Sequence, residues 1–326
     1  MLAGGALAAV PAVTDLEGSQ AAPAGVEQWL TGINEATRHC AYVGTFVVKA
    51  GNFVSSSRIW HVGDGHEQIE RIQALTGTAR TTFRLDDKVV TFLPSSHTVV
   101  SETGEGLGAF PSLLKLVNAS GINFYRLRRV GPGQVAGFDA DIVRLIPVDP
   151  LRFGYRIWVE KRTGLVVKLE TLDAHDNVLE QAAFADLQLT APLTLSELKA
   201  QMNTTQGYQM APAGQPATTI DKEGWDMDPQ VPGFDPVRCE KGRNTGGLGA
   251  DSRSVQCIFS DGLASVSVFI EPFDAARHAR LLGHHPLAMG ATHMRVRQLG
   301  DWWLTAVGEV PPQTLSVFLQ ALERKN

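Results

Sequence analysis

Residues 257–272 constrain the fold of this chain more than any other segment, because they read as two strands joined by a tight turn. The turn residues Ser260-Asp261-Gly262 tolerate the positive φ angles that a short hairpin requires. Pro272 ends the second strand, since proline has no amide proton to give to the ladder. The residues after the turn alternate, with a predicted buried face of Ala264, Val266, Val268 and Ile270 and a predicted solvated face of Ser265, Ser267 and Glu271. The segment has no nucleophile–base pair and no set of metal ligands, so it predicts a sheet that builds a core or an interface.

The length of the chain predicts more than one domain. A chain of 326 residues exceeds one ordinary hydrophobic core, and its 44% apolar content is typical of a globular protein. Residues 203–221 contain Gly207, Pro212, Gly214 and Pro216, a composition typical of linkers. We therefore expect a signal remnant at 1–22, a large domain at 23–200, a linker at 201–221 and a small C-terminal domain at 222–326.

The N-terminal residues resemble part of a secretory signal. An apolar run covers residues 2–13, and small residues around Ser19-Gln20-Ala21 offer cleavage sites, although no Lys or Arg precedes the run. The run is shorter than the roughly 18–20 apolar residues that span a bilayer. The sequence thus predicts an exported, soluble protein whose true start and cleavage site it does not define.

Cysteine usage agrees with export. Cys239 and Cys257 lie on either side of the glycine-rich residues 242–249, as on two strands of a hairpin. A disulfide between them would stabilise the fold by about 3 kcal/mol in the chain-entropy model. The alternative is two buried free thiols. Cys40 is the odd cysteine, and we expect it to be either buried or reactive.

Periodicity predicts an α+β protein. Val26, Trp29, Leu30 and Ile33 have helical spacing, so we expect a helix over residues 25–38. Further helices are predicted from Pro111 to Gly121, from the capping box of Thr194 and Glu197, and around Leu315, Phe318, Leu319 and Leu322. Strands are predicted at residues 42–48, 58–62, 67–72, 81–85, 89–93, 140–146, 154–160, 165–172, 178–187, 292–299 and 302–307. The expected architecture is a large antiparallel half-barrel sheet covered by helices, followed by a smaller α+β domain.

Several functional classes have little support. A net charge of −5 argues against general nucleic-acid binding, and the basic run Arg126-Leu127-Arg128-Arg129 reads as a solvated strand end, with anion contact as the alternative. The chain has no G-x-S-x-G elbow, and His278, His284, His285 and His293 match no zinc spacing. We predict a protein that is not an enzyme and that needs neither a cofactor nor a metal.

Two features favour binding. A long meander with one apolar face must close or be covered, and a partly covered sheet leaves a cavity for an apolar ligand. Adjacent residues on a strand point to opposite faces, so one of Trp302 and Trp303 is expected to point outward as an interface anchor. The candidate cavity residues, for which plain core packing is the alternative, are Tyr42, Phe46, Trp60, Phe83, Phe92, Phe153 and Trp158.

At these residues the sequence resembles the RseB/MucB family of periplasmic negative regulators of the envelope-stress sigma factor. The resemblance is spread over the chain and is carried by residues 42–47, 58–61, 70–71, 135–137, 147–158, 232–234, 260–272 and 308–311. The hairpin at 260–272 and the run at 308–311 are specific, whereas no single short motif is persuasive alone.

The resemblance implies a large domain shaped like the carriers of the lipoprotein-sorting pathway. It implies that the small domain helps to hold the periplasmic domain of a transmembrane anti-sigma factor, shielding it from regulated proteolysis. An amphiphile, either lipopolysaccharide or the acyl chains of a lipoprotein, would enter the large domain and release the partner. The solvated edge formed by Ser265, Ser267 and Glu271, or the strand of Trp302 and Trp303, is the expected partner interface. The alternative is a periplasmic carrier of lipoproteins, and a homo-oligomer stays open.

Overall fold

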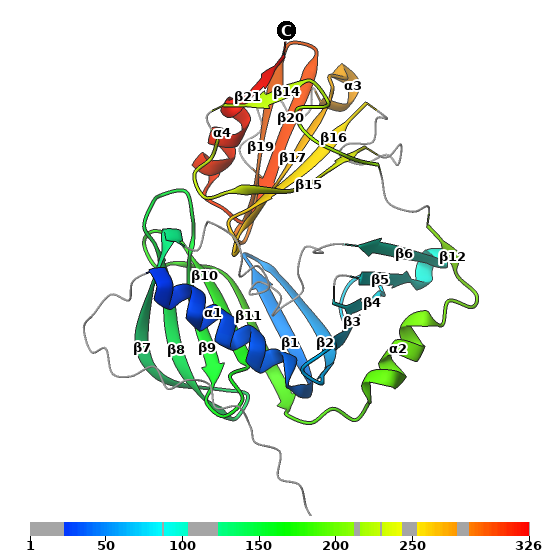
Figure 1. Ribbon diagram of the computed structural model, residues 1–326, viewed down its shortest axis with the longest axis vertical. Coiled ribbons are helices and arrows are strands. Elements are labelled where there is room, and N and C mark those ends of the chain that lie inside the picture. Colours follow the sequence, from blue (N-terminus) through cyan, green and yellow to red (C-terminus); the bar gives the residue numbers. More distant parts are fainter. Residues whose placement is uncertain are drawn as a thin grey trace, which may run out of the picture.

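Two antiparallel sheets, one large and one small, form the body of the protein. The computed structural model describes residues 23–86, 88–103, 123–211, 216–228, 230–242, 253–278 and 287–325. The larger sheet and two helices come from the first two thirds of the chain, and the smaller sheet stands on one end of this unit (Figure 1). The α+β architecture with a large open sheet and a smaller second unit is as predicted.

The large sheet has twelve strands in the order β12-β6-β5-β4-β3-β2-β1-β11-β10-β9-β8-β7. Neighbouring strands are mostly hairpin partners, but β1 pairs with β11 and so joins two meanders into one sheet. The strands are β1 (Ala41–Ala50), β2 (Phe53–Gly63), β3 (Gln68–Ala74), β4 (Thr81–Leu85), β5 (Lys88–Leu93), β6 (Thr98–Thr103), β7 (Tyr125–Val135), β8 (Phe138–Pro147), β9 (Gly154–Glu160), β10 (Val166–Leu172), β11 (Val178–Gln188) and β12 (Gln209–Met210), with a 3-10 turn at Pro94–Ser96.

Helix α1 (Pro23–Arg38) lies across the large sheet on its inner face (Figure 1). Its side chains Val26, Leu30 and Ile33 are buried in one cluster with the inward residues of β1, β2 and β7–β11. The predicted amphipathic helix over 25–38 is therefore confirmed, and its apolar stripe covers the apolar face of the sheet.

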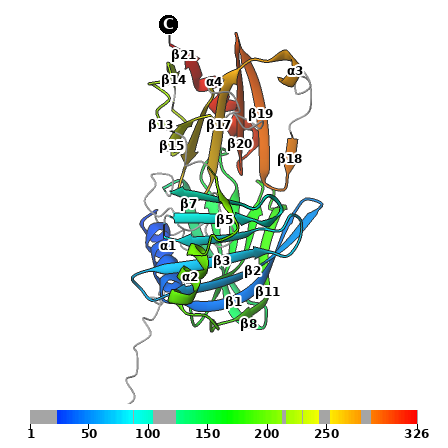
Figure 2. The ribbon, with the colours of Figure 1, turned by 90° about the vertical axis from the view of Figure 1, so that its right-hand side faces the viewer.

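Helix α2 (Leu195–Asn203) covers the opposite face of the sheet over β3–β6, as Figure 2 shows. It begins at the predicted capping box, in which the Thr194 hydroxyl accepts from the amide of Glu197 and the Glu197 carboxylate accepts from the amide of Thr194. Leu198 and Met202 of this helix pack on Ile69 of β3 and its neighbours. The two helices thus cover different halves and different faces of one sheet.

The small unit is a seven-stranded sheet with one main helix. Its order is β13-β15-β16-β17-β20-β19-β18, and the hairpin predicted at 257–272 forms its central strands. Helix α4 (Pro312–Ala321) packs on β19 and β20, and Leu315, Phe318 and Leu319 lie in the core, as predicted. The elements are β13 (Ala217–Thr218), β14 (Trp225–Met227), β15 (Asp235–Lys241), β16 (Val255–Ser260), β17 (Ser265–Pro272), α3 (Ala275–His278), β18 (Leu287–Met289), β19 (Thr292–Leu299), β20 (Trp302–Gly308) and β21 (Leu322–Arg324), where β14 and β21 pair separately.

The residues between α2 and β14 do more than connect. β12 adds to β6 of the large sheet, and β13 adds to β15 of the small sheet, so the segment expected as a linker is tied to both units. The helix predicted from Pro111 to Gly121 lies outside the described residues. None of the helices in the described ranges is long and apolar enough to cross a membrane.

Candidate functional site at the domain interface

The turn of the central hairpin inserts into the large domain. The Oδ1 atom of Asp261 accepts from the amides of Leu263 and Ala264, at 2.9 and 2.7 Å, so this carboxylate orders its own turn. Gly262 has φ 94°, the positive angle that the sequence predicted here. Leu263 lies in the hydrophobic cluster of the large domain, although the rest of the hairpin belongs to the small one. The hairpin therefore contributes to both cores.

The second oxygen of Asp261 joins the two domains. Its Oδ2 atom accepts from Nε of Arg152 at 2.8 Å and from the hydroxyl of Tyr125 at 3.0 Å, and both donors belong to the large domain. Asp261 and the Arg152 side chain are fully buried. Burial raises the pKa of Asp261, whereas its turn amides, Arg152 and Tyr125 favour the ionised form. Four donors on one carboxylate satisfy a charge that burial alone would make unfavourable.

Arg152 is held on all sides. Its guanidinium donates to Asp149 and to the carbonyl of Pro232, the latter at 2.6 Å. The guanidinium carbon lies 4.2 Å from the centroid of Phe124 and 4.7 Å from that of Phe234, which places the cation between two aromatic rings. Residues of the loop 147–154 and residues of the small domain thus form one polar and aromatic cluster.

The Pro232-Gly233-Phe234 motif fits closely against this cluster. Gly233 has φ 75°, and a Cβ there would lie 2.4 Å from Nη2 of Arg152 and 2.5 Å from Phe124. Glycine is therefore required both by the backbone angle and by the close approach of the arginine. Three separate motifs of the sequence, at 147–158, 232–234 and 260–272, meet at this single point between the domains.

Helix α4 adds two further bonds to the same loop. The Gln313 side chain donates to the carbonyl of Pro150 at 2.6 Å, and the Thr314 hydroxyl donates to the carbonyl of Leu151 at 2.8 Å. These two bonds tie the loop to the first turn of the helix.

A pair of acidic residues marks a second contact between the domains. Glu180 of β11 accepts from the amide of Ala291, and a Cβ on Gly290 would lie 2.7 Å from Ala50, so the β18–β19 turn packs on the large sheet. Burial, with the charge of Glu180, raises the pKa of Glu309 to about 7. Burial also raises the pKa of Glu180. Two carboxylates from different domains therefore lie close together in a partly desolvated environment.

The seven candidate cavity residues do not form one wall. The register pairs Tyr42 with His61 and His61 with Glu70, so Tyr42 and Phe46 point to the inner face with α1, while Trp60 on β2 points outward. Phe83 and Phe92 are buried on that outer face under α2. The expectation of a single cavity lined by all seven is wrong for this reason.

The two remaining candidates lie elsewhere. Phe153 lies at the domain interface, 5.8 Å from the ring of His293. Trp158 alternates along β9 with Ile157, which packs in the inner cluster, and it has Lys168 4.3 Å from its ring. Trp158 still belongs to the same buried cluster as Tyr42 and Phe46, whereas Phe153 does not.

The predicted solvated face of the hairpin is also covered. Ala264, Val266, Val268 and Ile270 are buried as expected. Glu271, however, is 1% exposed because the α3 side chains Arg277 and His278 bind its carboxylate, at 3.1 and 2.8 Å. Ser267 is buried as well, and Ser265 is half-buried. The expectation of a solvated edge is therefore wrong for Glu271 and Ser267.

The two tryptophans of β20 do point to opposite faces, but both are covered. Trp303 is fully buried and stacks on His278 with ring centroids 4.8 Å apart. Trp302 is half-buried and packs edge-on against Trp225, at 5.4 Å. An outward-pointing anchor on this strand is thus not what the structure shows.

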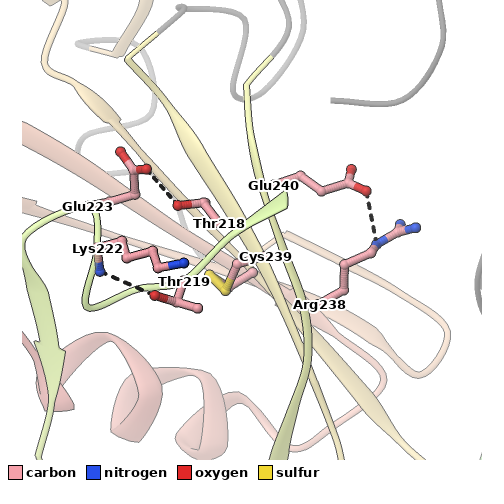
Figure 3. The surroundings of a disulfide bond; sticks show 8 residues. Thr218, Thr219, Lys222, Glu223, Arg238, Cys239 and Glu240 are labelled. Atoms are coloured by element: carbon pink, nitrogen blue, oxygen red, sulfur yellow. Dashed lines mark hydrogen bonds and ion pairs between the residues drawn. A yellow bond between two sulfur atoms is a disulfide. The ribbon is translucent and has the colours of Figure 1, made fainter. Parts of the chain in front are cut away.

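The disulfide joins β15 to β16 near the edge of the small sheet. Cys239 and Cys257 are directly opposite in the register and are bonded, which confirms the prediction (Figure 3). Around Cys239, Thr218 binds Glu223 and Arg238 pairs with Glu240 (Figure 3).

Cys40 is half-buried. Burial, with the charge of Glu160, raises its pKa to about 11, so the thiol is mostly protonated at neutral pH. Of the histidines considered as metal ligands, His278 binds Glu271 and His293 contacts the carbonyl of Ala291, while His284 and His285 lie outside the described residues. The described parts of the chain contain no cluster of three or more metal-ligating side chains.

Both domains match one protein family. Residues 25–202 match the MucB/RseB N-terminal domain, and residues 219–323 match the MucB/RseB C-terminal domain. The chain belongs to the MucB/RseB family. The resemblance read from the sequence motifs is thus confirmed.

Relatives in this family extend over nearly the whole chain. The sigma factor AlgU regulatory protein MucB of Pseudomonas aeruginosa is 29% identical over 314 residues, covering 94% of this chain and 91% of that protein. The sigma-E factor regulatory protein RseB of Escherichia coli is 21% identical over 284 residues, covering 86% and 85%. The solved complex of P. aeruginosa MucA/MucB has a TM-score of 0.69 and 25% identity, covering 93% of this chain and 99% of that one.

Sequence reasoning missed the residues that hold this MucB/RseB protein together. Arg152, Tyr125 and Glu309 were not singled out, although Arg152 and Glu309 lie inside recognised motifs. A buried Arg in a loop carries no periodic signal, and its partner Asp261 looked like an ordinary turn residue. The Pro232-Gly233-Phe234 motif, to which the sequence assigned no role, was the one sign that another side chain packs closely on Gly233.

Proposed function

We propose that this protein is a non-enzymatic periplasmic regulator that binds the periplasmic domain of a membrane-bound anti-sigma factor and shields it from regulated proteolysis. The observation that carries the proposal is the match of both domains to the MucB/RseB family, together with the fold shared with MucB in its complex with MucA. The relatives from Pseudomonas aeruginosa and Escherichia coli are both named as sigma factor regulatory proteins.

The domain interface supports a regulator whose two parts act together. Arg152 and Asp261 form a buried ion pair between the domains, and Leu263 of the small domain lies in the core of the large one. A change in the large domain therefore has a direct physical route to the small domain, through the loop that Gln313 and Thr314 hold.

We further propose that an amphiphile, lipopolysaccharide or lipoprotein acyl chains, releases the partner by binding the inner face of the large sheet. Helix α1 now fills this face with Val26, Leu30 and Ile33. The Tyr42 hydroxyl is buried there and has no hydrogen-bond partner among the described residues. An acyl chain that took the place of α1 would replace one apolar contact by another, so the exchange is physically reasonable. Such a ligand acts as a switch only if it binds the free protein more tightly than the complex.

A titration tests the switch. The purified protein is mixed with the labelled periplasmic segment of the anti-sigma factor, and lipopolysaccharide is added while anisotropy is followed. The proposal predicts that the apparent dissociation constant rises, by about 5- to 150-fold for a typical coupling energy. An unchanged constant at saturating lipopolysaccharide would contradict the switch while leaving the binding itself established.

A further inference from the structure

Three arginines form a row across neighbouring strands of the large sheet. The register places Arg128 of β7 opposite Arg144 of β8, and Arg144 opposite Arg156 of β9. The alternate residues Leu127 and Leu145 are buried in the inner cluster, so the arginines lie on the outer face. Directly opposite like charges destabilise a sheet, and here Arg144 and Arg156 are balanced by ion pairs with Asp176 and Glu170.

A carboxylate of the protein itself, that of Asp176, already binds to this row of arginines. Arg144 binds Asp176 through both terminal nitrogens, with Nη1 2.9 Å from Oδ2. The hydrogen bond from Arg144 and the charges of Arg144, Arg156 and Arg128 lower the pKa of this exposed carboxyl. Several guanidinium groups therefore act on a single oxyanion, the arrangement that suits a phosphate.

The edge of the sheet widens this surface. A pocket of about 230 Å³ lies between β7 and β8 at the edge of the sheet, lined by Arg126, Leu127, Arg128, Ile146, Pro147 and Val148. Val130 is 51% exposed and Val148 is 46% exposed, so apolar side chains flank the cationic row. In a chain of net charge −5, this face gathers five cationic side chains and two carboxylates, namely Arg126, Arg128, Arg144, Arg156 and Lys168 with Glu170 and Asp176.

We propose that the outer face of β7–β9 docks on an anionic phospholipid membrane. Headgroup phosphates would bind Arg126 and Arg128 at the pocket and the row beside it, while Val130 and Val148 enter the headgroup layer. A sheet face presents arginines at the spacing of its strands, so it contacts several phosphates of a surface at once. This docking goes beyond the binding of a partner protein, because it would hold the large domain at the membrane in a fixed orientation.

Vesicle co-sedimentation tests the proposal. The full chain is mixed with phosphatidylcholine vesicles or with vesicles that also contain phosphatidylglycerol. We expect binding to the anionic vesicles that falls as salt is raised, and a loss of about tenfold or more in partitioning for the double variant R126Q/R128Q. The double variant R80Q/K88Q removes two exposed charges elsewhere on the large domain and should bind like the wild type. All three proteins carry the same N-terminal segment, so their difference reports this face.

Three results would overturn the proposal. One is equal binding of the wild type and of R126Q/R128Q, with both proteins melting at the same temperature. Another is equal binding to neutral and anionic vesicles. The third is that R126Q/R128Q keeps its vesicle binding but loses affinity for the anti-sigma segment, which would assign the row to a protein partner.

Discussion

The Nε atom of Arg152 lies 2.8 Å from Oδ2 of Asp261, and this buried ion pair joins the large domain to the small one. The pair lies where the loop 147–154, the motif at 232–234 and the turn of the hairpin at 260–272 meet. The interface therefore depends on a charge pair that neither domain can complete alone. Separating the two domains would break this pair and leave both charges to be solvated by water.

Replacing Asp261 by Ala should strongly destabilise the protein. The change removes the fully buried carboxylate of Asp261 from Arg152, which keeps only the partly exposed Asp149, and breaking such a buried pair typically costs about 3–5 kcal/mol of unfolding free energy. Urea denaturation followed by tryptophan fluorescence measures the loss. As the matched control, D176N removes a carboxylate that pairs with Arg144 at the surface and should cost no more than about 1 kcal/mol. Equal losses in the two variants would show that the Arg152–Asp261 pair does not hold the interface.

Gly233→Ala should also lower the free energy of unfolding, and a second glycine, Gly207, serves to separate the two causes of this loss. Both Gly233 and Gly207 have positive φ, at 75° and 83°, but a Cβ at Gly207 meets nothing within 4 Å. G207A should therefore cost only the backbone strain of about 1–2 kcal/mol. G233A adds a clash with Arg152 and Phe124, worth about 1–3 kcal/mol more, in the same denaturation experiment. If the two alanine variants were equally stable, the close packing at Gly233 would be excluded.

Glu309 should make the stability fall as the pH rises. Its pKa of about 7 in the folded protein exceeds the ordinary 4.5, so the folded state binds more protons between these values. The contribution of Glu309 to the free energy of unfolding is therefore largest below pH 4.5, and it falls by about 2–3 kcal/mol between pH 5 and pH 8. E309Q carries no charge, so it should be the more stable protein at pH 8 and show a flatter profile.

The control for this profile is E323Q, which neutralises an exposed carboxylate of the same domain. It should keep the pH dependence of the wild type. Glu180 lies beside Glu309 and can titrate with it, and Tyr155, His293 and the Arg152–Asp261 pair also face this interface. Thermal melts of the wild type, E309Q and E180Q from pH 5 to pH 8 therefore separate the contribution of Glu309 from that of Glu180. A slope in E309Q identical to that of the wild type would place the titrating group elsewhere.

The disulfide should contribute only under oxidising conditions. Cys239 and Cys257 are separated by 18 residues, for which the chain-entropy model gives about 3 kcal/mol. C239S should lower the melting temperature of the oxidised protein and melt like the wild type after full reduction. C40S, which leaves the bond intact, serves as the control. Identical melting of C239S and the wild type without reductant would mean that the bond adds nothing.

Periodic residues made most of the elements predictable. The spacing of Val26, Leu30 and Ile33 gave helix α1, the capping box at Thr194 gave the start of α2, and alternation gave the central hairpin. In each case the signal is local, since it depends on neighbours within a turn or a strand.

The site depended on contacts that no local pattern carries. Glu271 alternates like a solvated residue, yet α3 folds back over it and supplies Arg277 and His278. Tyr42 and Phe83 are both aromatic strand residues, but the register places them on opposite faces of one sheet. Which face a strand residue occupies relative to a distant strand is set by the pairing, and the pairing of β1 with β11 spans more than a hundred residues.

The most direct test of the account is a binding measurement between the purified full chain and the periplasmic domain of the membrane-bound anti-sigma factor from the same organism. Isothermal titration calorimetry of the wild type should give saturable binding, and the D176N variant, whose change lies at the surface, should bind equally well. The absence of saturable binding by folded wild-type protein would contradict the proposed function.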